Sequence, residues 1–154
     1  MKKKKTKVAL LIGIVAMIII GATVAWNIVF DYSKILKANW GFSIPSESRY
    51  SEIYSKDSGM SFHGDGIRYH IFSYKKEEAI NEMVMWQSTE QSTVFCGSYS
   101  EAATERLDEI DVPLEKRPNY TECCYWYQTQ NDHSEIIIFL DKGQKKLYFV
   151  ELFL

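Results

Sequence analysis

The stretch ECCYWYQTQNDHSEIIIFLDKGQKKLYFVELF, residues 122–153, holds the clearest fold signal in the sequence. It contains three runs of aromatic and β-branched residues, separated by the polar segments 131–133 and 141–144. Such runs between clusters of turn-forming residues are typical of strands joined by tight hairpins. The stretch therefore predicts a three-stranded antiparallel meander, with strands over residues 122–130, 135–140 and 146–153.

Two helices are predicted upstream of the meander. Apolar residues recur at helical spacing over residues 75–86, which favours a first helix. A polar, Ser/Thr-rich stretch over residues 87–97 then predicts a loop. Ser98 followed by Glu101 matches a capping box, so we expect the second helix to begin at Ser98 and end near Asp111.

A β-hairpin is expected ahead of the helices. Residues 50–56 and 67–74 are rich in Tyr and Ile, and residues 57–66 between them have turn chemistry. The two prolines within residues 112–119 predict an extended connection from the second helix to the meander. Hairpin, two helices and meander together favour the α+β class, with an antiparallel sheet of about five strands covered on one face.

The first 30 residues have the pattern of a membrane anchor. Residues 1–7 contain five lysines and no acid, and residues 8–26 carry no charge. A helix over the uncharged run would be about 28 Å long, close to the hydrocarbon thickness of a bilayer. Lysines next to such a helix stay in the cytoplasm. We therefore expect a cytoplasmic tail over residues 1–7, a single-pass transmembrane helix in the lipid bilayer over residues 8–30, and a C-terminus outside the cell.

A cleaved signal peptide, leaving a secreted product, is the alternative reading of the same segment. Cleavage after Ala25 would place Thr23 at the third position back, and apolar residues resume at Trp26, which suits an interfacial anchor. With the anchor retained, residues 31–48 are expected to form a juxtamembrane helix and linker. Residues 49–154 then form one extracytoplasmic domain of modest size.

The segment after the anchor is acidic. From residue 31 onward it contains 13 basic and 20 acidic residues, a formal charge near −7. An acidic domain is repelled by nucleic acid and by anionic lipid surfaces. Nucleic acid is therefore excluded as a partner, and we expect a protein or peptide partner instead.

The most distinctive local pattern is DSGMSFHGDG, residues 57–66, in which two glycines flank Asp65. It resembles the Phe-His-Gly-Asp-Gly turn of small membrane-tethered or exported proteins of Gram-positive bacteria, with a weaker echo around Trp126 and over residues 142–151. Those relatives often read His-Gly-Gly before the Phe, where this chain has residues 59–61, Gly-Met-Ser. The resemblance implies a similar hairpin and no activity.

Four residues are candidates for binding: His63 and Asp65 in the turn, His70 in the following strand, and Trp126 among the aromatics of the meander. The structural alternative is that His63 and Asp65 hydrogen-bond the turn itself. Imidazole and carboxylate suit zinc, but a site needs three or four convergent ligands, so no metal or other cofactor is predicted.

Cys96, Cys123 and Cys124 give two further alternatives. Outside the cytoplasm, Cys96 can form a disulfide with one of the adjacent pair, or all three can stay reduced and pack as small hydrophobes. Neighbours on a strand point to opposite faces, so only one of Cys123 and Cys124 can face the core.

No catalytic residue is predicted, because the sequence lacks a nucleophile elbow, a phosphate loop and a Cys-x-x-Cys pair. The favoured hypothesis is a membrane-anchored binding or accessory module that uses its sheet face or the turn at residues 62–66. A thiol- or metal-dependent enzyme is the second hypothesis. An immunity-type protein, which protects its own cell at the membrane, is the third.

Overall fold

The computed structural model describes residues 31–59, 64–88 and 93–154, with the backbone alone over residues 93–97. The chain divides into two units, one ending at Ser43 and one beginning at Ile44. The predicted transmembrane helix at residues 8–30 lies outside the described residues. Within the described part of the chain, no helix combines the length and hydropathy needed to cross a membrane.

Helix α2, Tyr32–Trp40, belongs to the first unit and has its own beginning and end. Asp31 caps its N-terminus by accepting a 3.1 Å hydrogen bond from the Ser33 amide. Gly41 closes its C-terminus at a φ of 82°, and its amide donates to the Lys37 carbonyl. A helix is thus present within residues 31–48, and its place beside a membrane stays a prediction.

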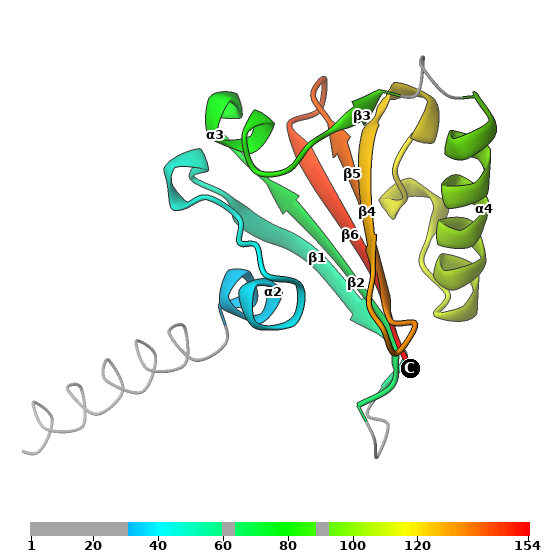
Figure 1. The fold of residues 1–154 in the computed structure, drawn as a ribbon. Helices are drawn as coiled ribbons and strands as arrows, with labels where there is room; N and C mark the ends of the chain where they lie inside the picture. Colours follow the sequence, from blue (N-terminus) through cyan, green and yellow to red (C-terminus); the bar gives the residue numbers. More distant parts are fainter. Residues whose placement is uncertain (1–30, 60–63, 89–92) are drawn as a thin grey trace, which may run out of the picture. The chain divides into compact units, whose positions relative to one another are not determined.

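The second unit contains a six-stranded antiparallel sheet in the order β1-β2-β6-β5-β4-β3 (Figure 1). The predicted hairpin forms β1, Ser51–Asp57, and β2, Gly66–Ser73, and the predicted meander forms β4, Cys124–Thr129, β5, Glu135–Asp141, and β6, Lys146–Phe153. Pairing of β2 with β6 joins hairpin and meander into one sheet. The sixth strand is β3, Gln87–Ser88, which falls where a loop was expected and pairs with β4.

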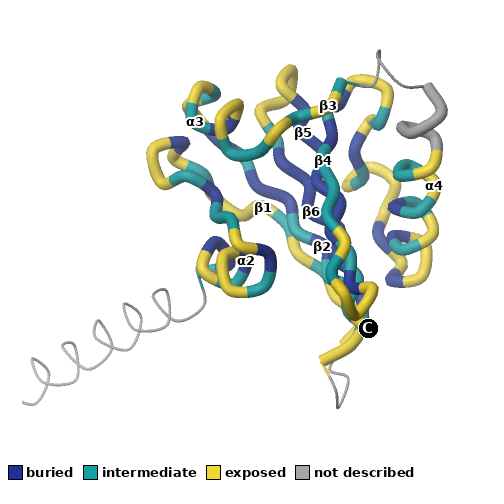
Figure 2. The backbone as a smooth tube through the Cα atoms, viewed as in Figure 1, coloured by how far each residue is buried: buried dark blue, intermediate teal, exposed yellow. Residues whose placement is uncertain are grey.

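Helix α4, Thr93–Glu109, covers one face of this sheet (Figures 1 and 2). Leu107 and Ala103 of the helix pack against Tyr69, Val150 and Phe139 of the strands, all of them buried. When the inward-facing residues of neighbouring strands pack against one apolar helix face, all of them are removed from water, and this burial stabilises the fold. This is the α+β arrangement that the sequence predicts.

The opposite face is buried as well, so the expectation of a sheet covered on one face is too narrow. Ile136, Ile138 and Phe149 point away from α4 and are 0% exposed. Six consecutive residues of β5, Ile136 to Asp141, are buried. A strand buried on both faces has an unbroken apolar run rather than alternation, as EIIIFLD does.

Both predicted helices have different bounds in the structure. The first is reduced to α3, Glu77–Asn81, because the Trp86 indole and the Met83 amide both donate to the Ile80 carbonyl and turn the chain. The second begins at Thr93, so Ser98 lies inside α4 and its capping-box spacing is coincidental. The extended connection expected over residues 112–119 contains one single-turn helix, η3, Leu114–Lys116, and a second, η4, Tyr120–Glu122, follows it.

Candidate functional site

The end of the β1–β2 hairpin is closed by side chains of Asp57 and Ser58. Ser58 donates its amide to the Ile67 carbonyl at 2.9 Å, and its Oγ accepts the Ile67 amide at 3.0 Å. Asp57 Oδ1 accepts the Gly59 amide at 2.9 Å. Such side-chain acceptors two residues before a donor fix a turn. These two residues carry the structural role that the sequence suggests for Asp65.

Two glycines shape the returning side of this hairpin end. Gly64 has a φ of 83° and Gly66 a φ of 133°, both in regions that side chains rarely adopt. A Cβ atom on Gly64 would meet nothing within 4 Å, so only its backbone angle favours glycine. At Gly66 there is a second reason, because a Cβ atom there would collide with Ser58.

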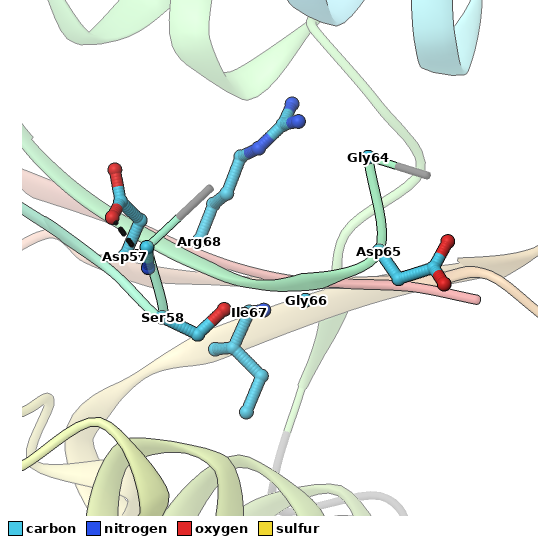
Figure 3. Close-up of a pocket in the computed structure, with 8 residues that line it drawn as sticks. Asp57, Ser58, Gly64, Asp65, Gly66, Ile67 and Arg68 are labelled. Atoms are coloured by element: carbon cyan, nitrogen blue, oxygen red, sulfur yellow. Dashed lines mark hydrogen bonds between the residues drawn. The ribbon is translucent and has the colours of Figure 1, made fainter. Parts of the chain in front are cut away.

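A hollow of about 190 Å³ lies between the two sides of the hairpin end (Figure 3). Its charged lining residues are Asp57, Asp65 and Arg68. Figure 3 shows their side chains pointing in three different directions. The Arg68 guanidinium lies 4.3 Å from the centre of the Phe153 ring, a cation–π contact that fixes it on the sheet. We call the surface formed by residues 57–59 and 64–68 the hairpin hollow.

Among the described residues, Asp65 makes no contact that explains its position between two glycines. Its residue is exposed, and its carboxylate makes no hydrogen bond or ion pair with the residues that the structure describes. A solvated carboxylate on a backbone fixed by glycine conformations is available to a ligand. His63, the other turn candidate, lies outside the described residues.

His70 and Trp126 share the sheet face opposite α4 but do not form one site. Cross-strand register places them in one row, His70–Phe149–Ile138–Trp126, with two strands between them. Three strand spacings separate them by about 14 Å. His70 Nδ1 is 2.6 Å from Glu52 Oε1, and its ring stacks on Phe72. The His70 side chain is therefore engaged by residues of its own domain.

The adjacent cysteines face opposite sides, as their spacing predicts. Cys123 is 2% exposed in the core beneath α4, and Cys124 is half-buried. Neither forms a disulfide bond with another residue that the structure describes. The side chain of Cys96 lies outside the described part, so a pairing of Cys96 stays a prediction.

A second polar cluster lies at the opposite end of the sheet and has no signature in the sequence. The Tyr74 hydroxyl and Asp141 Oδ2 are buried and have no hydrogen-bond partner in the described part of the chain, while Asp141 Oδ1 accepts the Gln144 amide at 2.7 Å. Burial, followed by the charges of Glu77 and Asp141, raises the pKa of Tyr74 to about 12. The side chains of Tyr74 and Asp141 are buried, so neither is placed to exchange a proton with a ligand.

Among the described residues no three His, Cys, Asp or Glu side chains are grouped to hold a metal ion. The chain matches no family model, no curated protein and no solved structure. The site must therefore be interpreted from its own geometry.

Proposed function

We propose that this chain is a membrane-anchored, extracytoplasmic binding module that contacts a protein or peptide partner through the hairpin hollow. The observation that carries this proposal is Asp65, an exposed residue between two glycines of positive φ, whose carboxylate contacts none of the residues that the structure describes. An exposed turn that presents an uncommitted polar group is typical of recognition loops.

The geometry favours the hairpin hollow over the sheet face. Phe149 and Ile138, at the centre of the face opposite α4, are 0% exposed, and Tyr69 and Val150 on the other face are also 0% exposed. Buried central residues offer no contact area to a partner. Gly64 and Asp65, in contrast, are exposed at the end of the sheet.

Anchoring is proposed on the sequence pattern of residues 1–30, with the lysine tail in the cytoplasm. This topology is tested by fractionation and protease shaving of intact cells. A protected N-terminal tail with an accessible domain supports the proposal. A secreted product that starts near Trp26 contradicts the anchor and supports signal-peptide cleavage.

Binding through the hairpin hollow is tested by in-cell photocrosslinking from a probe at position 68, which lines the hollow and leaves Asp65 in place. The matched control carries the probe at Glu109, an exposed residue at the end of α4. A partner band from position 68 that Asp65→Ala removes, with the control position silent, supports the proposal. Equal labelling from both positions contradicts it.

The enzyme hypothesis has a separate test in the same preparation. Metal analysis and titration with a thiol reagent report a bound metal or a fast-reacting cysteine. Either result would favour the enzyme over the binding module. The immunity-type role is one form of the binding module, in which the crosslinked partner is a toxin.

A further inference from the structure

The outer edge of β1 is open and leads into the hairpin hollow. β1 is the terminal strand of the sheet and pairs with β2 alone among the described residues. Ser51, Glu52, Ile53, Ser55 and Asp57 are exposed along it, and Ile53 keeps 50% of its surface in water. An edge strand presents unpaired amides and carbonyls, which are a template for another strand. At the other edge, β3 has only two residues, too few for such a template.

Two charged side chains of β1 could block this edge, but both are bonded to other residues of the domain. Lys56 Nζ donates a 2.7 Å hydrogen bond to the Asp111 carbonyl, and Glu52 Oε1 lies 2.6 Å from His70 Nδ1. Lysine on an edge ordinarily repels a second strand by projecting outward. The bulge between Glu52 and Tyr54 protects the start of β1, while the register from Tyr54 to Asp57 is regular. Four residues of regular edge therefore remain.

The charge of this region selects a basic occupant. β1 ends at Asp57, which lines the hairpin hollow together with Asp65, whereas the one cationic side chain among the described lining residues, Arg68, is stacked on Phe153. Residues 31–154 as a whole are acidic, with 13 basic against 20 acidic residues. Charge of one sign along a binding surface steers partners of the opposite sign.

We infer that the partner supplies an extended, basic segment that adds as a strand to the edge of β1 and places a cationic side chain over the hairpin hollow. The inference rests on the proposed binding function and specifies its partner class. Ser55 and Asp57 have backbone amides and carbonyls that face away from β2, and main-chain hydrogen bonds to them supply affinity without strict sequence demands. The cation at Asp57 and Asp65 supplies selectivity.

The test uses the full chain in nanodiscs and a short peptide of alternating lysine and valine. We expect this peptide to shift the backbone resonances of residues 54–57 and to slow amide exchange at Ser55 and Asp57. A peptide of alternating glutamate and valine is the matched control and should leave both unchanged. Equal effects of the two peptides, or effects confined to residues outside β1 and the hairpin hollow, overturn the inference.

Charge variants at Ser55 provide a second measurement that leaves the core untouched. Ser55 is exposed and lies opposite His70 in the register. Ser55→Lys should weaken binding of the basic peptide and Ser55→Glu should strengthen it, each by about threefold, the effect of one exposed charge pair. Affinities that do not change in opposite directions contradict the charge argument.

Two outcomes separate this inference from the proposed function. If Asp65→Ala abolishes the cellular crosslink while both Ser55 variants keep it unchanged, the hairpin hollow binds a partner but the β1 edge does not. If the resonances of residues 54–57 change with protein concentration when no peptide is present, a second copy of the chain occupies the edge, and a basic partner is excluded.

Discussion

A Cβ atom on Gly66 would lie 2.3 Å from Ser58 Oγ, the atom that accepts the Ile67 amide and closes the hairpin. The glycine and the serine therefore depend on each other. Any side chain at position 66 must displace Ser58, and the hydrogen bond to Ile67 is then lost as well.

Gly66→Val should lower the free energy of unfolding by about 1–3 kcal/mol from backbone strain, with the loss of the Ser58 contact in addition. Gly64→Ala should cost less, because its Cβ atom meets no neighbour. Asp65→Ala is the control and should leave stability unchanged. Urea melts of the three variants measure these values. A Gly66 variant as stable as wild type would show that the hairpin end tolerates another conformation.

Removal of the hydroxyl should change the free energy of unfolding in different ways at two buried tyrosines. The Tyr69 hydroxyl donates a 2.6 Å hydrogen bond to the Lys116 carbonyl, whereas the Tyr74 hydroxyl has no partner among the described residues. Tyr69→Phe should cost about 1–2 kcal/mol, because the carbonyl is left unsatisfied. Tyr74→Phe should be neutral or stabilising, since it removes a buried polar atom that makes no bond. Equal losses in paired denaturant melts would contradict this contrast.

Stability should fall in strong base as buried phenols ionise. Burial, followed by the charge of Asp141, raises the pKa of Tyr148 to about 12 from the ordinary value of 10.0, as burial does for Tyr74. The folded state thus holds these protons more tightly than the unfolded state. Their contribution is complete below pH 10.0 and is lost as the pH rises through 12.

Absorbance titration of the phenols, alongside melts between pH 9 and 12, measures this linkage. Tyr74→Phe should remove one late-titrating group and leave that of Tyr148 in place. If every tyrosine titrates near 10 while the protein stays folded, the phenols of Tyr74 and Tyr148 are not buried as the structure describes.

The adjacent thiols should differ in reactivity. Cys123 is 2% exposed, while Cys124 is half-buried. In a Cys96→Ser background, a thiol reagent should modify Cys124 first and reach Cys123 only when the domain opens. Peptide mapping after timed labelling distinguishes them. Simultaneous modification in native buffer would mean that Cys123 is not sealed beneath α4.

How well the sequence predicts the fold depends on how local each signal is. β6 has the predicted bounds, Lys146–Phe153, because its strand residues follow a glycine-containing turn. β3 is missed, since two polar residues have no periodicity and pair only through β4. The early start of α4 at Thr93 is missed for a related reason, because packing extends it through a stretch whose composition favours a loop.

The candidate site is predicted in part. The glycines around Asp65 mark the turn, because their conformational freedom is visible in residue type alone. The roles of Asp57 and Ser58 depend on which residues the hairpin brings opposite each other, and this register is absent from the local pattern. The burial of both sheet faces does have a sequence signal, which is the unbroken apolar run of β5. We predict a strand from this run but do not infer from it that both faces are covered.

The place of β6 in the strand order has a consequence for the order of assembly. β6 lies between β2 and β5, so the hairpin and the rest of the meander share no direct strand pairing without it. Residues 146–153 are synthesised after every other strand of this sheet. A chain emerging from a ribosome or a translocation channel therefore cannot complete the sheet until that segment is out. Until then it carries two separate groups of strands with open edges, the pair β1–β2 and the three strands β5, β4 and β3. In that state a chaperone would have most to bind.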